Sequence, residues 1–75
     1  GEAVDIECPG QSNYMVAKWI EENLDFDQLI LEFYIPGKEN SGWVHVSYKS
    51  EGNRKSVLTA MKENGNTVYK AGLIQ

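Results

Sequence analysis

The segment from Trp43 to Tyr48 constrains the fold most, because it combines β-branched and aromatic residues with the only histidine of the chain, His45. Side chains alternate between the two faces of a β-strand. The even-numbered residues, two valines and a tyrosine, are therefore expected on one face and can pack in a core. The odd-numbered residues place His45 between Trp43 and Ser47 on the opposite face. This pattern predicts a strand that carries an imidazole beside an indole and a hydroxyl.

A second short run, from Ala3 to Cys8, has the same character and carries a carboxylate among small and apolar residues. Alternation places its aliphatic residues on one face and Asp5 on the other. Pro9-Gly10 ends this strand, because proline lacks the donor of a ladder hydrogen bond and glycine adopts turn conformations easily. We expect the strand to lie beside Trp43–Tyr48, so that Asp5 and His45 face a common site.

The segment from Asn13 to Asn23 is the only convincing helix of the sequence. Its apolar residues recur with helical spacing and predict one stripe, made of Val16, Trp19, Ile20 and Leu24. Ser12 and its neighbours can cap the first turn, and Asn23 suits the C-terminal end. We therefore expect this stripe, with Trp19 as its largest member, to pack in the core.

Further strands are expected before and after the histidine strand. Gln28 to Tyr34 is nearly continuous in apolar residues, which predicts a central strand covered on both faces. Ser56 to Met61 fits either a strand or a short helix, and its β-branched residues favour a strand. Asn64-Gly65 is a strong hairpin signal, and Thr67 to Tyr69 would form the return strand. The sequence thus predicts an α+β fold, with one helix packed on a mostly antiparallel sheet.

The composition of the chain excludes several classes of function. Its 75 residues suffice for one small domain with a thin core. The net charge of −4 and the scattered basic residues argue against binding of nucleic acid or of an anionic membrane surface, since both need a basic face. A single cysteine, Cys8, allows no intrachain disulfide. It is expected to be a small hydrophobe and not a nucleophile, because no second histidine is available as its base. No apolar run approaches the length of a membrane span.

Three residues are candidates for chemistry, and each also has an ordinary explanation. Asp5 and His45 offer a carboxylate oxygen and an imidazole nitrogen, which are zinc ligands. A lone histidine in a strand is, however, more often only hydrogen-bonded or exposed. Glu32 stands out among apolar residues, because a buried carboxylate is costly unless it is paired. It could act as a base, or it could pair with a lysine at a sheet edge. Trp43, like Trp19, is expected in the core.

Three segments carry a family resemblance: Gly1-x-Ala3-x-Asp5-Ile6, Phe26-Asp27-Gln28-Leu29-Ile30-x-Glu32-Phe33 and Trp43-Val44-His45-Val46-Ser47. Together they resemble the zinc D-Ala-D-Ala peptidases of the M15 type, most closely the phage and prophage branch. The resemblance covers positions 1 to about 50, and the remaining residues look like the tail of that branch. It implies a small α+β domain whose antiparallel sheet carries the metal site. Residues 1–75 would be the C-terminal part of that domain.

The resemblance also implies the metal ligands. In that family zinc is held by a histidine, an aspartate and a second histidine. The aspartate of the family motif corresponds to Asp5, and the second histidine corresponds to His45. The first histidine would lie three residues before Gly1, so we expect a natural chain that is longer upstream. Two protein ligands alone are expected to hold zinc poorly, because catalytic sites normally use three. Residues 1–75 are therefore expected to be inactive by themselves.

The catalytic base is the point at which the chain departs from the family. Several branches carry an acidic residue three positions before the second histidine, and Gly42 stands there instead. Glu32 is then the best candidate for the base, and Asp27 is the second. The implied reaction is zinc-assisted hydrolysis of an amide bond, in which a carboxylate takes a proton from water and passes it to the leaving amine.

The function implied by the resemblance is hydrolysis of peptidoglycan stem peptides, as a D-Ala-D-Ala carboxypeptidase or an endolysin-type endopeptidase, with Zn²⁺ as cofactor. The implied setting is lysis of the bacterial cell wall by a phage or prophage, with the protein in the host cytoplasm before its release. We expect a monomer. An alternative is a non-catalytic relative that keeps the fold as a binding or structural module. A third alternative is an unrelated small α+β interaction domain.

Overall fold

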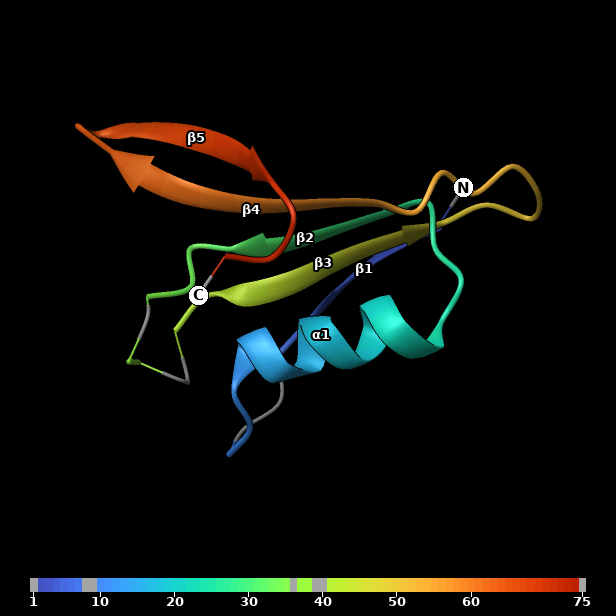
Figure 1. Ribbon diagram of the computed structural model, residues 1–75, viewed down its shortest axis with the longest axis horizontal. Coiled ribbons are helices and arrows are strands. Elements are labelled where there is room, and N and C mark those ends of the chain that lie inside the picture. Colours follow the sequence, from blue (N-terminus) through green and yellow to red (C-terminus); the bar gives the residue numbers. More distant parts are fainter. Residues whose placement is uncertain (1, 8–9, 36, 39–40, 75) are drawn as a thin grey trace.

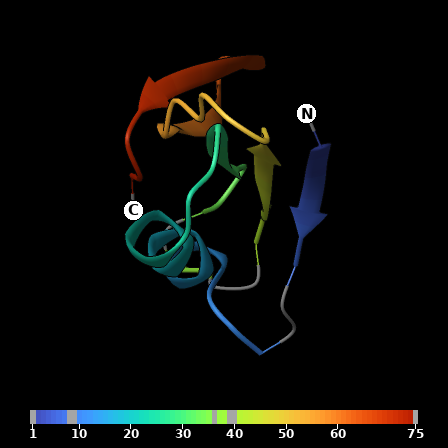
Figure 2. The ribbon, with the colours of Figure 1, turned by 90° about the vertical axis from the view of Figure 1, so that its right-hand side faces the viewer.

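The computed structural model describes residues 2–7, 10–35, 37–38 and 41–74. These residues form five strands and one helix: β1 (Glu2–Ile6), α1 (Asn13–Asn23), β2 (Gln28–Glu32), β3 (Trp43–Tyr48), β4 (Ser56–Glu63) and β5 (Asn66–Ala71). The strands make one sheet in the order β1-β3-β2-β4-β5 (Figure 1). The sheet is curved, and α1 lies against one of its faces, as Figure 2 shows.

The predicted α+β class is wrong. Strands and bridges make up 47% of the described residues and helix only 16%, so the protein has a small β-rich fold. The sheet is mixed, because β2 and β4 run parallel while the other neighbouring pairs run antiparallel. The parallel pair follows from the path of the chain. β3 runs antiparallel to β2, so it ends beside the start of β2. After the turn that follows β3, β4 begins at that same end of the sheet, with Ser56 beside Gln28, and therefore runs in the direction of β2. Within the described residues, no helix has the length and apolar content needed to cross a membrane.

The first three strands lie close to their predicted positions. β3 has the predicted ends, and it pairs antiparallel with β1 as expected. β1 spans Glu2–Ile6 and is shorter than the predicted strand, and Cys8 lies outside the described residues. β2 ends at Glu32, two residues earlier than predicted, because Phe33 has a φ of +57°. A positive φ is uncommon for a residue with a side chain, and it interrupts the alternation of the strand.

The segment that fitted either a strand or a helix is a strand. β4 runs from Ser56 to Glu63, so the preference for a strand is confirmed. Asn64 (φ +52°) and Gly65 (φ +81°) connect it to β5, as the hairpin signal predicted. Two successive positive φ angles are what a two-residue hairpin turn of the commonest type requires.

The helix α1 begins and ends where the sequence predicts, but it buries a different stripe. The Ser12 hydroxyl accepts a hydrogen bond from the Met15 N–H and caps the first turn. Ala17 and Ile20 are buried, whereas Trp19 is 56% exposed. The predicted core position of Trp19 is therefore wrong. Two residues of an α-helix are about 200° apart around its axis, so the burial of Ala17 turns the indole of Trp19 outward.

The core lies between α1 and the face of the sheet that carries Leu29, Leu31 and Val44, all fully buried. β2 is central as predicted, but the prediction that both of its faces are covered is wrong. Its residues alternate between buried and half-buried, because a single helix covers one face only. We call the other face the open face. In β2 and β3 it carries Gln28, Ile30, Glu32, Trp43, His45 and Ser47.

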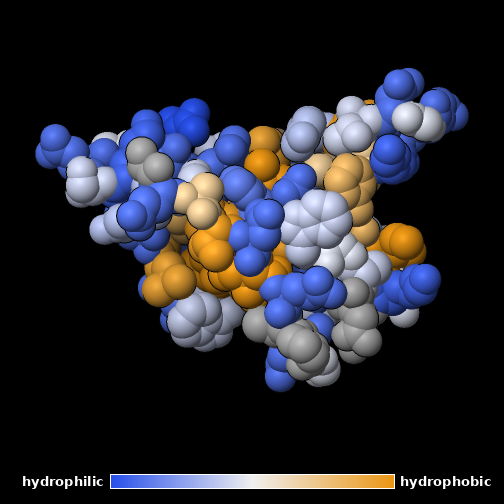
Figure 3. Space-filling view, turned by 180° about the vertical axis from the view of Figure 1, so that it is seen from behind, coloured by the Kyte–Doolittle hydropathy of each residue, from blue (hydrophilic) through white to orange (hydrophobic). Residues whose placement is uncertain are grey.

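β1 is the edge strand beside β3, and most of its residues are exposed. Val4, for example, is 53% exposed. Figure 3, in which the molecule is seen from behind, shows apolar residues at the surface among hydrophilic ones. Among the described residues, nothing pairs with the outer edge of β1, so this side of the sheet is open to solvent.

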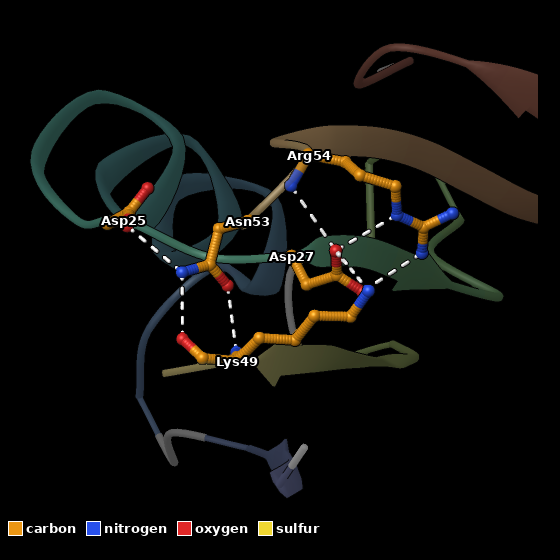
Figure 4. A network of polar contacts seen from close by, with 5 residues as sticks. All are labelled: Asp25, Asp27, Lys49, Asn53 and Arg54. Carbon is orange, nitrogen blue, oxygen red and sulfur yellow. Dashed lines mark hydrogen bonds and ion pairs between the residues drawn. The ribbon is translucent and has the colours of Figure 1, made fainter. Parts of the chain in front are cut away.

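A polar network ties the turn between β3 and β4 to the start of β2 (Figure 4). Asp27 accepts two hydrogen bonds of 2.9 Å from the Arg54 guanidinium and one of 3.2 Å from the Arg54 backbone N–H. Lys49 Nζ lies 3.7 Å from the same carboxylate. Asn53 donates to Asp25 and to the Lys49 carbonyl oxygen. The hydrogen bonds from Arg54 lower the pKa of Asp27 to about 2.

Truncation of Phe26 and of Trp19 should have very different effects on stability. Phe26 is 1% exposed, and Phe→Ala changes in a core cost about 3–5 kcal/mol. Trp19→Ala should cost much less, because most of the indole is already in water. Urea unfolding of the two variants measures the difference. Equal losses in the free energy of unfolding would place Trp19 in the core after all.

Asp27→Asn should remove a stabilisation that depends on pH. The pKa of Asp27 is about 2 in the folded chain and lies below its ordinary value of 3.8, so the unfolded state binds more protons between these values. The stabilisation is fully present above pH 4 or so and is lost as the pH falls towards 2. Urea midpoints of the wild type and of Asp27→Asn should therefore converge in acid. Glu51→Gln, at an exposed carboxylate in the turn between β3 and β4, serves as the control. A gap that stays constant from pH 7 to pH 2 would contradict this assignment.

Candidate metal site

β1 and β3 place Asp5 and His45 side by side on the open face. The two residues are direct partners in the antiparallel register, and Asp5 Oδ1 lies 2.8 Å from His45 Nδ1. The alternation of β3 explains their orientation, because Val44 is fully buried towards α1 and the next side chain must point the other way. The structure thus brings the two predicted metal ligands together, and their role as ligands stays a prediction.

Glu32 reaches the same place from β2. In the register of β2 and β3, Glu32 lies opposite Trp43 and Ile30 lies opposite His45, so Glu32 is a diagonal neighbour of the histidine. A long side chain can span such a diagonal. One potential ligand atom from each of Asp5, Glu32 and His45 lies within 4.8 Å of the other two. Three neighbouring strands therefore bring two carboxylates and one imidazole together.

A hydrogen bond from Trp43 holds Glu32. The indole Nε1–H donates to Glu32 Oε2 at 3.0 Å. The partner that stabilises this carboxylate among apolar residues is thus an indole and not the lysine considered from the sequence. Trp43 is half-buried on the open face, so the prediction of a core position is wrong. The position of Trp43 two residues before His45 indicated that the two side chains share one face of the strand.

The donor set fits a zinc ion. Zinc binds imidazole nitrogen and carboxylate oxygen at about 2.0–2.2 Å, so the atoms that bind one ion lie within about 4.4 Å of one another. One atom from each of the two predicted ligands and from Glu32 lies within 4.8 Å of the others, so an ion held by Asp5 and His45 would lie beside the Glu32 carboxylate. The side chain of Asp5 is 65% exposed and that of His45 is 29% exposed, so ions can reach the group from solvent. Two carboxylates beside one imidazole also attract a cation.

Asp27, the second candidate for the base, lies elsewhere. It precedes β2, whereas Glu32 is the last residue of that strand. The Arg54 guanidinium binds its carboxylate and keeps its pKa at about 2. A carboxylate with so low a pKa is a poor proton acceptor at neutral pH. Of the two candidates, the structure places only Glu32 beside the Asp5–His45 pair.

Close packing requires a glycine at position 42, immediately before β3. The φ of Gly42 is +68°, which side chains rarely adopt. A Cβ there would clash with the Glu32 carbonyl oxygen and lie 2.7 Å from the Tyr34 backbone nitrogen. Asn13 Nδ2 donates to the Gly42 carbonyl oxygen at 3.1 Å and so ties the start of β3 to α1. These contacts explain why no acidic residue occupies the position three before His45.

Gly42→Ala should destabilise the fold more than Gly52→Ala. Both glycines have a positive φ, whose strain costs about 1–2 kcal/mol for a residue with a Cβ. Only Gly42 has backbone atoms within 4 Å of the added methyl group, whereas Gly52 has none. Urea unfolding measures the loss in the free energy of unfolding. Gly52→Ala reports backbone strain alone, and Gly42→Ala reports backbone strain plus the clash with β2. Equal destabilisation would show that the backbone of β2 moves away from position 42 at no cost.

Comparisons of the chain with known proteins were made at three levels. No protein-family model, no curated protein sequence and no solved structure matches it. The resemblance to the zinc D-Ala-D-Ala peptidases therefore remains a prediction carried by the quoted residues. The functional argument depends on the geometry of Asp5, Glu32 and His45.

Proposed function

We propose that the chain is the metal-binding part of a zinc peptidase that hydrolyses peptide bonds in peptidoglycan stem peptides. The observation that carries this proposal is the convergence of Asp5, Glu32 and His45 within 4.8 Å on the open face. The resemblance marks Asp5 and His45 as ligands from two segments 40 residues apart, and the fold pairs these two residues directly. A coincidental pairing of that kind is much less expected than either residue alone in a strand.

The residues of the chain divide the work of hydrolysis. Asp5 and His45 would hold the ion through a carboxylate oxygen and an imidazole nitrogen. A bound zinc ion supplies polarisation of the scissile carbonyl and makes water a nucleophile at neutral pH. Glu32 takes the proton of the attacking water on its carboxylate and gives it to the leaving amine. Its hydrogen bond to Trp43 uses part of the acceptor capacity of the carboxylate and leaves the rest for that proton.

The substrate class comes from the resemblance and agrees with the exposure of the site. A stem peptide attached to a polymer must be reached at an open surface, and Asp5 lies on an exposed edge strand. The product of such a reaction would be a shortened or cleaved stem peptide, as in phage or prophage lysis of the bacterial wall. The proposal treats the protein as a monomer that acts on the wall after release from the host cytoplasm.

A second candidate function is a binding or structural module without catalysis. The observation that favours it is Gly42, because packing excludes an acidic side chain at the position where several branches of the resembled family carry their base. In this alternative Glu32 would be only a hydrogen-bond partner of Trp43. Hydrolysis separates the two functions, since both allow the chain to bind peptide and metal.

Zinc binding that depends on Asp5 and His45 is the first expected outcome. In an NMR titration with ZnCl₂, the His45 ring signals should follow a binding curve for one ion per chain, at an excess of zinc because Asp5 and His45 are only two ligands. Asp5→Ala should abolish the shift of the His45 ring signals, and His45→Ala should abolish the zinc-induced shift of the Asp5 backbone amide signal, because each change removes a ligand atom. Asp25→Asn, at an exposed carboxylate outside the site, should leave both shifts unchanged. A zinc response that survives in His45→Ala would contradict the proposed site.

Peptide hydrolysis is measured with the same zinc-loaded chain. Release of D-alanine or of a new amino group from a D-Ala-D-Ala stem peptide should fall about 10²–10⁴-fold in Glu32→Gln, which is the usual contribution of a general base. Hydrolysis by the wild type would rule out the non-catalytic module.

A further inference from the structure

We propose that Trp43 is a positioning residue that holds the Glu32 carboxylate against the Asp5–His45 pair. The inference rests on the proposed function and assigns a task to a residue that the resemblance does not. Trp43 touches neither Asp5 nor His45 through a hydrogen bond in the structure. It acts through Glu32, its direct partner across β2 and β3.

The free Glu32 side chain would not stay in one place. It has several rotatable bonds and lies half-buried on the open face, where water competes for the carboxylate. Within residues 2–7, 10–35, 37–38 and 41–74, no lysine or arginine forms an ion pair with it. The hydrogen bond from Trp43 Nε1–H, 3.0 Å long, is the contact that selects one orientation. An indole has a single N–H donor, so its direction fixes which carboxylate position is favoured.

The indole is itself held in place by its neighbours. The Phe33 ring packs against it with a centroid distance of 5.6 Å and an interplanar angle of 54°. Lys62 Nζ lies 5.8 Å from the centroid of the Phe33 ring and covers that ring in turn. Gly42 allows the chain before β3 to pack closely on the end of β2. The packing of Phe33 against Trp43 therefore restricts the orientation of the indole and of its N–H donor.

The positive φ of Phe33 has a role in this arrangement. In a regular strand, Phe33 would point away from Glu32, towards α1. With φ +57°, its ring instead packs on Trp43, which is on the open face beside Glu32. The backbone of a residue in this conformation is strained, and such strain persists where the surroundings hold it in place. The kink thus places an apolar wall beside the carboxylate at the end of β2.

The experiment combines a double-mutant cycle with a matched tryptophan control. Trp43→Phe keeps an aromatic ring against Phe33 but removes the N–H donor, and Glu32→Leu removes the acceptor. Each should weaken zinc binding about tenfold or more, the usual effect of changing a residue that supports a metal site. The double variant should bind no more weakly than the weaker single variant, because both changes break one interaction. Trp19→Phe, the same substitution at the exposed tryptophan, should leave the affinity unchanged.

The indole N–H signals give a readout that a purely structural role would not move. During the zinc titration of the wild type, the Trp43 indole signal should shift together with the His45 signals, and the Trp19 signal should stay still. In Glu32→Leu, which has no acceptor, the Trp43 signal should move towards that of Trp19 and should no longer respond to zinc. This second measurement keeps the test decisive if Trp43→Phe does not fold.

The outcomes separate the inference from the proposed function. His45 signals that ignore zinc in the wild type would overturn the proposed function, and the inference with it. A zinc response of His45 with a stationary Trp43 signal would overturn the inference alone. Additive losses in the double variant, or wild-type affinity in Trp43→Phe, would do the same.

Discussion

The rest of the structure depends on the pairing of β3 with a strand on each side. Val44 is fully buried towards α1, and this single packing requirement fixes which face every other residue of β3 presents. The antiparallel register with β1 then sets Asp5 opposite His45, and the register with β2 sets Glu32 opposite Trp43. A slip of one residue in either pairing would move these side chains to the wrong face and dissolve the candidate site.

The carboxylates at the two ends of β2 differ in their hydrogen-bond partners, and these partners decide the role of each carboxylate. At the start of the strand, Asp27 is bound by Arg54 and has a pKa of about 2, so its charge serves to anchor the turn after β3. At the other end, Glu32 receives one hydrogen bond from an uncharged indole. It keeps acceptor capacity free and lies beside Asp5 and His45. The carboxylate of Asp27 thus stabilises the fold, whereas that of Glu32 is the one that we propose as the base.

The candidate site is also coupled to the core by the segment that precedes β3. Asn13, the first residue of α1, donates hydrogen bonds to the carbonyl oxygens of Ser41 and Gly42. Gly42 packs on the backbone at the end of β2, next to Glu32, whose side chain points to the open face. Helix position, loop conformation and carboxylate orientation are therefore linked through a few backbone contacts. The close packing of position 42 on the backbone of β2 excludes a side chain there, so the fold itself excludes an acidic residue at this position.

Local periodicity was enough to predict most of the elements. The bounds of α1 and β3, the strand character of β4 and the hairpin at Asn64-Gly65 all follow from nearest-neighbour chemistry in the sequence. The pairing of β1 with β3 was predicted from their shared pattern, and it brought Asp5 and His45 together as expected. The fold class was not, because the balance of helix and strand and the parallel pairing of β4 depend on the path of the whole chain.

The sequence by itself determined which residues alternate, where the helix lies and which two side chains share a face across β1 and β3, because these features depend on local spacing. Only the tertiary structure decided the rest. It turned Trp19 outward, since the helix packs on the sheet through Ala17 and Ile20 instead. It ended β2 at the kink of Phe33, and it gave Glu32 a tryptophan as its partner. Each of these outcomes depends on contacts between segments distant in sequence, and no local pattern encodes such contacts.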